Sequence, residues 1–227
     1  MEDFLSNISL KVNEHVYLKD PESSKLGKKI IQGSIYLIEE FGFEAFTFKK
    51  LANHINSTEA SIYRYFENKT KILLYLTVWY WSWMESRLLF STANIKNKEE
   101  QLEIAIKILT SRVEEDGNFT HINEVKLHHI IYEESSKAYL NRHVDDENKH
   151  GVFSSYKNIV SRVSDIMLAI NPEFVYPNML TSTIIEGAHL QRFFAKHLPR
   201  LTNQTKDKDD VEHFYTLLAL NTLKTAK

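Results

Sequence analysis

The sequence predicts an all-α protein, and two observations lead to that prediction. Apolar residues recur at intervals of three and four positions along most of the chain, which is the spacing of one buried helix face. Glycine and proline are scarce, with 6 and 4 among 227 residues, and several of them stand where an apolar run begins or ends.

Length and composition limit the class of protein. A chain of 227 residues with 43% hydrophobic residues can bury a core, and the absence of cysteine excludes disulfides and thiolate metal sites. No signal peptide is recognisable, and the longest nearly uncharged apolar run, residues 72–84, is shorter than the ~20 residues of a membrane span. We therefore expect a soluble cytoplasmic protein with no membrane segment.

The first long helix is expected to follow a clear start signal. Asp20 or a nearby serine can cap it, and Pro21 and Glu22 suit a first turn. Apolar residues then recur at helical spacing from Leu26 onward, until Gly42 marks a plausible end.

Two short amphipathic segments follow, joined by a polar turn. Thr47 is placed to cap the first segment, whose inward residues are expected to be Phe48, Leu51, Ala52 and Ile55. Asn56 suits the left-handed backbone that such a turn often needs. Thr58 is placed to cap the second segment, in which Ile62 and Phe66 point inward and the residues left to face outward are Glu59, Ala60, Ser61, Tyr63, Arg64 and Tyr65.

This pattern has the outline of a helix-turn-helix. Small side chains at Ala60 and Ser61 would let the second helix enter a major groove, while hydroxyl and guanidinium groups reach phosphates and base edges. Lys and Arg outnumber Asp and Glu by eight to six between Glu22 and Lys71. Because the whole chain has a net charge of −2, this mild local excess favours nucleic-acid binding only weakly.

The segment Leu51-Ala52-x-x-Ile55-Asn56-Ser57-Thr58-x-Ala60-Ser61-Ile62-Tyr63-x-x-Phe66-x-x-Lys69 resembles the DNA-binding signature of the TetR/AcrR family of transcriptional regulators. It aligns without gaps. It departs from the family at Asn56, Ser57 and Ala60, where glycine, valine and glycine are usual, and each substitute is small or tolerates a turn.

The resemblance implies a set of DNA-contacting residues. Thr47 and Lys69 correspond to phosphate contacts, and Lys49 to the outward neighbour that reaches a base or a phosphate. The positions that read bases are Glu59, Ala60, Ser61 and Arg64. Tyr63 and Tyr65 correspond to phosphate or groove contacts, and Thr58 also belongs to the expected DNA-binding set. Glu59 is unusual in a DNA interface because its carboxylate repels phosphate. Two roles fit it: accepting a hydrogen bond from a cytosine amino group, or pairing with a neighbouring lysine.

The resemblance also implies a domain organisation. Residues 1–21 form an N-terminal arm, 22–72 a three-helix DNA-binding domain with the helix-turn-helix, and 73–227 a larger helical domain for effector binding and dimerisation. In the arm, Ile8, Leu10 and Val12 alternate with polar residues. This pattern suits a loosely ordered terminus, or an arm that packs on the body or lies along DNA.

We expect a homodimer joined through the last two helices, as is typical of the family. Apolar residues of these helices could form both core and dimer seam: Leu180, Ile184, Ala188, Phe193, Phe194, Phe214, Leu217, Leu218 and Leu220. The expected function is that of a regulator, and of a repressor in particular. Such a repressor would bind a palindromic double-stranded DNA operator and be released by an unknown small-molecule effector.

A weak hypothesis places the effector beside aromatic residues of the second domain. A long aromatic helix is expected over residues 68–89, and Trp79 and Trp83 share one face of it. With Tyr132 and Tyr156 they could line an apolar cavity. Plain core packing is the more common role of such aromatic side chains.

An enzyme is not expected. Two Glu-x-x-His pairs, Glu147 with His150 and Glu186 with His189, resemble ligands of di-iron helical bundles, but such a site needs further inward carboxylates. No nucleophile elbow, glycine-rich phosphate loop or dinucleotide fingerprint is present, so no cofactor and no metal are predicted. The alternative to a regulator is a helical ligand-binding or metal-dependent bundle protein that keeps the motif as scaffold.

Overall fold

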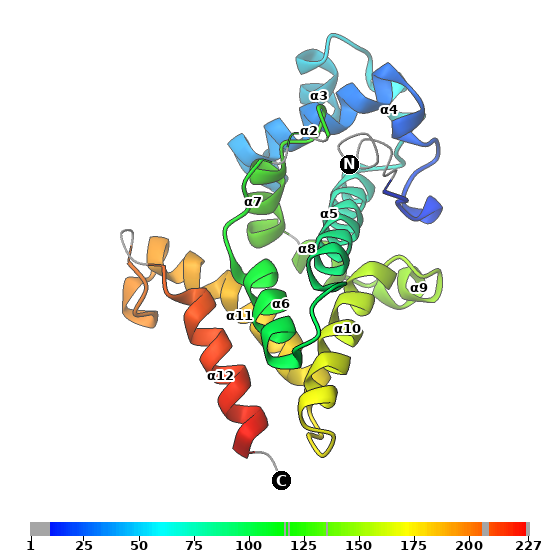
Figure 1. The fold of residues 1–227 in the computed structure, drawn as a ribbon. Helices are drawn as coiled ribbons and strands as arrows, with labels where there is room; N and C mark the ends of the chain where they lie inside the picture. Colours follow the sequence, from blue (N-terminus) through cyan, green and yellow to red (C-terminus); the bar gives the residue numbers. More distant parts are fainter. Residues whose placement is uncertain (1–9, 116, 118, 135, 206–208, 226–227) are drawn as a thin grey trace. The chain divides into compact units, whose positions relative to one another are not determined.

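A computed structural model describes residues 10–115, 117, 119–134, 136–205 and 209–225. Every regular element within these ranges is a helix (Figure 1), so the all-α prediction is confirmed. None of the helices in the described ranges is both long and apolar enough to cross a membrane.

The chain divides into two compact units. The first comprises Met1–Trp83 and Val113–Ser154, and the second comprises Met84–Arg112 and Ser155–Lys227. The domain borders predicted from the sequence, after residues 21 and 72, divide the chain by expected function and not by packing. They stay a prediction.

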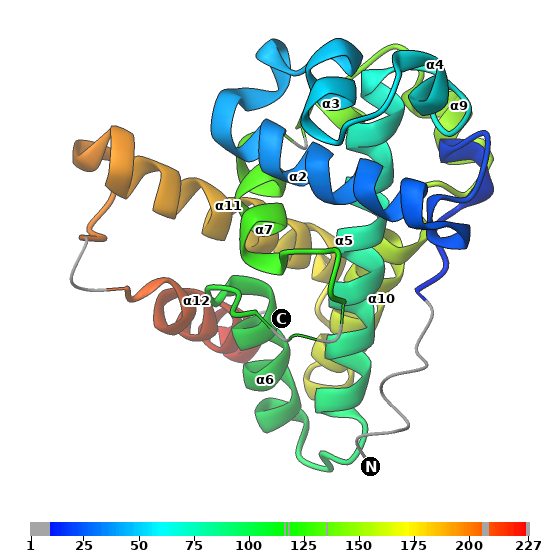
Figure 2. The ribbon, with the colours of Figure 1, turned by 90° about the horizontal axis from the view of Figure 1, so that it is seen from above.

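The first unit contains the helix-turn-helix segment together with the chain that follows residue 113. Its described helices are η1 (Glu14–Val16), η2 (Pro21–Ser23), α2 (Lys25–Ala45), α3 (Phe48–His54), α4 (Glu59–Tyr63), α7 (Glu124–Glu134), α8 (Ser136–Tyr139) and α9 (Val144–Lys149), and it includes the first part of α5 (Lys69–Thr92). Helix α2 packs against α7 and α3, and α3 packs against α4 (Figure 2).

Pro21 and Glu22, expected in the first turn of the long helix, instead belong to η2 with Asp20 as its cap, and helix α2 begins at Lys25. The side chain of Ser24 caps it by accepting a hydrogen bond from the Gly27 backbone N–H at 3.0 Å. Gly42 has φ 78° and ψ 159°, which interrupts the helix three residues before its end at Ala45. That combination of angles is almost exclusive to glycine, so Gly42 sets the corner between α2 and α3.

Helix α5 is buried on all sides over residues 72–84. A helix that is apolar all round belongs inside a core and not at its surface. Trp79 and Trp83 stack on one face with ring centroids 6.3 Å apart, and Trp81, which points away from them, is also buried.

The described part of the N-terminal arm packs on the first unit. Val12 and Val16 are buried, and the backbone N–H of Leu18 donates to the Tyr65 carbonyl at 2.7 Å. Asn13 donates to the His150 carbonyl at 2.9 Å. The arm is therefore fixed to the body from Val12 onward, whereas the pattern that begins at Ile8 lies partly outside the described residues.

The second unit contains the rest of the helices. They are α6 (Lys98–Thr110), α10 (Ser154–Ile170), α11 (Pro177–His197), η3 (Pro199–Leu201) and α12 (Val211–Thr225), together with the last part of α5. Helices α6, α11 and α12 pack against one another. Gly187 of α11 lies directly under the hydroxyl of Tyr215 of α12, so a larger residue at this position would force Tyr215 to shift.

Candidate nucleic-acid interface

The first helix of the motif forms as its capping residue predicts. The Thr47 hydroxyl accepts a hydrogen bond from the Lys50 backbone N–H at 3.2 Å. Phe48, Leu51 and Ala52 are buried. Lys49 and Thr47 are exposed, so α3 presents a hydroxyl and an ammonium group on its outer side.

The turn after α3 has the backbone that the sequence predicts. Asn56 has φ 53°, the one positive φ among the described residues other than glycine. The next amide, that of Ser57, donates back to the Ala52 carbonyl at 2.8 Å. Asparagine therefore replaces the usual glycine without loss of the turn, because it tolerates the left-handed region.

Helix α4 is capped by Thr58 and held by two core residues. The Thr58 hydroxyl accepts from the Ser61 backbone N–H at 3.2 Å, and Ile62 and Phe66 are fully buried. The outer side of α4 is left with exposed Glu59, Ala60, Tyr63 and Arg64, and Ser61 is half-buried. The Tyr63 ring rests edge-on against Phe48 at 4.7 Å.

The expectation that Tyr65 faces outward is wrong. Its side chain is only 4% exposed, and its hydroxyl forms a 2.7 Å hydrogen bond with the hydroxyl of Ser24. Tyr65 instead joins the end of α4 to the start of α2. The partner lies 41 residues away in sequence, so no local pattern indicated this role, and Tyr65 has no exposed ring with which to contact DNA.

Lys69 lies at the start of α5 and is anchored to the corner after α2. Its ammonium group donates to the carbonyl of Phe43 at 3.0 Å and to that of Glu44 at 3.1 Å. Two of its three donors are therefore used inside the protein. A phosphate contact through the third donor stays a prediction.

The same corner has a second set of contacts that sequence analysis missed. Glu134, the last residue of α7, accepts a hydrogen bond from the Phe43 backbone N–H at 3.0 Å. Lys137 pairs with Glu134 at 2.6 Å and with Glu44 at 3.1 Å. Because these residues lie about 90 positions apart in the chain, only the fold reveals that α7 and α8 hold the corner beside Thr47.

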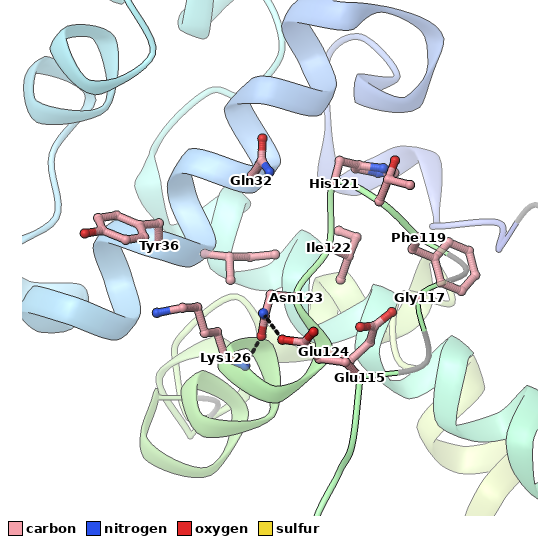
Figure 3. A pocket seen from close by; sticks show the side chains of 12 residues that line it. Gln32, Tyr36, Glu115, Gly117, Phe119, His121, Ile122, Asn123, Glu124 and Lys126 are labelled. Atoms are coloured by element: carbon pink, nitrogen blue, oxygen red, sulfur yellow. Dashed lines mark hydrogen bonds between the residues drawn. The ribbon is translucent and has the colours of Figure 1, made fainter.

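A cavity of about 350 Å³ lies in the first unit between α2 and the segment that leads into α7 (Figure 3). Its lining combines polar and apolar side chains and consists of Gln32, Ile35, Tyr36, Glu115, Gly117, Phe119, Thr120, His121, Ile122, Asn123, Glu124 and Lys126. Tyr36 also stacks on His54 of α3 at 5.0 Å. One wall of the cavity is therefore in direct contact with the helix-turn-helix.

None of the four residues expected around an effector lines this cavity. Trp79 and Trp83 are buried in the core, where Trp79 also packs edge-on against Phe119 at 5.0 Å. Tyr132 contacts the His128 ring at 4.1 Å in the first unit. Tyr156 belongs to the second unit, where its hydroxyl donates to Glu186 at 2.9 Å. An effector pocket at these residues stays a prediction.

The two Glu-x-x-His pairs lie in different units. Glu147 is buried and pairs with Lys71 at 3.1 Å. Burial, with a smaller contribution from the charge of Arg192, lowers the pKa of His189 to about 3. Within the described ranges, no three side chains of the ligand types are grouped so that they could hold a metal ion.

The helix-turn-helix region resembles that of a known family of proteins. The sequence pattern of the bacterial regulatory proteins of the tetR family matches residues 30–76, which cover most of α2, the helix-turn-helix and the start of α5. No curated protein matches the chain.

Three solved structures resemble the fold. The fatty acid degradation regulator FadR from Bacillus halodurans has a TM-score of 0.56 and 15% identity, covering 88% of this chain and 98% of its own. AibR, solved with isovaleryl coenzyme A and operator DNA, has a TM-score of 0.53 and 15% identity, covering 83% and 95%. The superantigen PfiT has a TM-score of 0.53 and 19% identity, covering 92% and 98%. Because one of these three structures is that of a superantigen, the fold alone does not define a function.

Proposed function

Through residues 30–76 the chain belongs to the tetR family of bacterial regulatory proteins, and we propose that it is a transcriptional repressor that binds operator DNA as a homodimer. The observation that carries the proposal is the geometry of α4. Its buried residues fix it against α3, and it presents Glu59, Ala60, Tyr63 and Arg64 to solvent at the positions from which a recognition helix contacts a major groove.

Further contacts come from the residues around α4. Exposed Thr47 and Lys49 lie on α3 and its cap, where they would contact phosphates and so orient the recognition helix. Thr58, Ser61 and Lys69 complete the proposed interface, with one free donor on Lys69. Tyr65 is left out because it is buried.

Homodimerisation through α11 and α12 is supported by the apolar surface of these two helices. Leu190 and Phe193 of α11 and Phe214, Leu217 and Leu218 of α12 are 36–52% exposed, and their spacings of three and four residues put each set on one helix face. Ile184 and Ala188 are buried within the unit. A two-fold dimer would place two recognition helices ~34–36 Å apart, which corresponds to a palindromic operator.

A small-molecule effector completes the proposal. AibR, which has a similar fold, was solved with isovaleryl coenzyme A as well as with operator DNA. An effector shifts operator affinity only through its different affinities for the DNA-bound and free forms. The proposal also implies that the protein acts in the cytoplasm, where the operator lies.

Selection of bound duplexes followed by gel shift tests the proposal. The protein is expected to enrich a palindromic sequence and to bind it with an affinity that falls steeply as salt is raised from 50 to 200 mM. Lys49→Ala should weaken binding and lower the slope of log affinity against log salt by about 2, because each of two copies loses one phosphate contact.

Matched controls separate this result from a general effect of charge. Lys107→Ala removes an exposed lysine from α6 and should leave the slope unchanged. Tyr63→Phe removes a hydroxyl but keeps the ring against Phe48, so a loss of affinity would assign a contact to that hydroxyl. Failure of the protein to select any duplex would overturn the proposal and favour a helical binding protein that keeps the motif as scaffold.

A further inference from the structure

Glu59 is the first residue of α4 and the only acidic residue within that helix. Its side chain is exposed at a recognition position. A carboxylate at this position is unfavourable for DNA binding unless a specific hydrogen-bond donor compensates for its repulsion of phosphates.

The structure decides between the two roles that the sequence leaves open for Glu59. The ammonium group of Lys50 donates to the Ala45 carbonyl at 2.8 Å, and that of Lys69 is bound to two carbonyls at the corner after α2. Across the part of the chain that the structure describes, no Lys, Arg or His nitrogen lies within ion-pair distance of the Glu59 carboxylate. The carboxylate therefore remains available to DNA.

The neighbouring hydroxyl groups are neutral acceptors, and each is partly used inside the protein. The hydroxyls of Thr58 and Ser61 bond to each other at 2.9 Å, and that of Thr58 also accepts from the Ser61 backbone N–H. Ala60 has no polar side-chain atom. Glu59 thus provides the strongest free hydrogen-bond acceptor at the start of α4.

A carboxylate distinguishes among the base edges of the major groove. Guanine and thymine present acceptors there, which repel it. Adenine presents its amino donor beside the N7 acceptor, whereas cytosine presents an amino donor alone. Cytosine is consequently the base edge that best matches an ionised carboxylate.

We propose that Glu59 accepts a hydrogen bond from the 4-amino group of a cytosine in each operator half-site and so selects a C·G pair at that position. The inference rests on the proposed function, since it names a base that the same interface recognises.

Selection from a random duplex pool, carried out with the wild-type protein and three variants, tests the inference. The wild type should enrich a half-site with an invariant cytosine at one position, and replacing that C·G pair by T·A should weaken binding by about 5-fold or more per half-site. Glu59→Ala should still bind the operator but lose the preference at that position alone. Glu59→Gln should shift the preference from cytosine toward adenine, because glutamine bonds to the amino group and N7 of adenine together.

Glu67→Ala is the matched control, since Glu67 is an exposed acidic residue just beyond α4. It should leave the selected sequence unchanged. Circular dichroism should show native helix content for all three variants, because both glutamates are exposed.

The outcomes separate this inference from the proposed function. If the wild type selects a palindrome and Glu59→Ala keeps every base preference, Glu59 does not read cytosine, although the protein remains a DNA-binding regulator. If the wild type selects no duplex, both proposals are overturned. Loss of preference at the same position in Glu67→Ala would also contradict the assignment to Glu59.

Discussion

The carboxylate of Glu134 accepts a hydrogen bond from the backbone N–H of Phe43 at 3.0 Å, across 91 residues of sequence. Phe43 directly follows Gly42, where the helical hydrogen-bond ladder of α2 is interrupted. The end of α7 therefore satisfies a donor that the interruption would otherwise leave inside the protein. Lys137 strengthens this contact between α7 and the corner after α2 by forming ion pairs with both Glu134 and Glu44.

Removal of the hydrogen bond between Glu134 and Phe43 should destabilise the first unit. Glu134→Ala leaves the Phe43 N–H without its partner in a half-buried position, and we expect a loss of about 1–3 kcal/mol in the free energy of unfolding, measured with urea. Glu134→Gln keeps an acceptor oxygen and should cost less. Glu103→Ala, on the exposed side of α6, should change stability by less than ~0.5 kcal/mol. Equal stability of Glu134→Ala and the wild type would show that the hydrogen bond is replaced by water.

The crossing of α11 and α12 should not accept a larger residue at Gly187. A Cβ there would overlap the Tyr215 hydroxyl and lie only 3.0 Å from the ring carbon that bears it. We expect Gly187→Ala to destabilise the protein by about 1–3 kcal/mol through overpacking.

A double-mutant cycle identifies the atom responsible. Tyr215→Phe removes the overlapping oxygen, so the cost of Gly187→Ala should be smaller in the Tyr215→Phe background than in the wild type. If the two costs are equal in thermal unfolding, the overlap with the hydroxyl is not what makes glycine necessary.

Asp209 should make the second unit sensitive to acid. It accepts hydrogen bonds from Arg112 at 3.0 Å and from Arg192 at 3.1 and 3.3 Å. Burial alone would raise the pKa of Asp209, but hydrogen bonding and charge from Arg192, with help from the Val211 amide and Arg112, lower it below 3.8. A carboxyl group with a lowered pKa in the folded state stabilises the protein above its unfolded pKa, and that stabilisation is lost as pH falls through the folded pKa.

The pH dependence of unfolding checks this assignment. The wild type should lose stability below about pH 4, where aspartate begins to be protonated in the unfolded state. Asp209→Asn should be less stable at pH 7 and should show a shallower fall toward pH 2. Parallel curves for the two proteins would mean that Asp209 contributes nothing to acid unfolding.

The apolar face of α12 should control the oligomeric state. Leu217→Glu places a charge in the proposed seam, where burial in a dimer would leave it without a partner, so the variant should be monomeric by light scattering at concentrations where the wild type is dimeric. Phe90→Glu changes an exposed apolar residue of α5, outside the seam, and should leave the dimer intact. A monomeric wild type, or dimeric Leu217→Glu, would refute the proposed seam.

The helix-turn-helix was predictable because the interactions that form it are local. The Thr47 and Thr58 caps bond to amides three residues ahead, Asn56 adopts its left-handed conformation within a single turn, and the buried residues recur at helical spacing. Capping, turn geometry and burial of one helix face depend on neighbours within one or two turns, so the residue types were sufficient.

Other features depend on partners far away in the chain. Tyr65 faces inward because Ser24 lies beside it, and Lys69 is anchored because the corner at Phe43 is within reach. The composition of α5 indicated that its aromatic residues lie in a core, but not which of them would contact Phe119.

Sequence alone thus determined the two helices of the helix-turn-helix, their threonine caps and the face that α4 turns to solvent, since these follow from periodicity and from the conformational preferences of individual residues. Tertiary structure decided which polar side chains on that face are free. A hydroxyl, ammonium or carboxylate group can contact DNA only through the hydrogen-bonding capacity that its internal partners leave free, and the fold brings such partners together from distant parts of the chain.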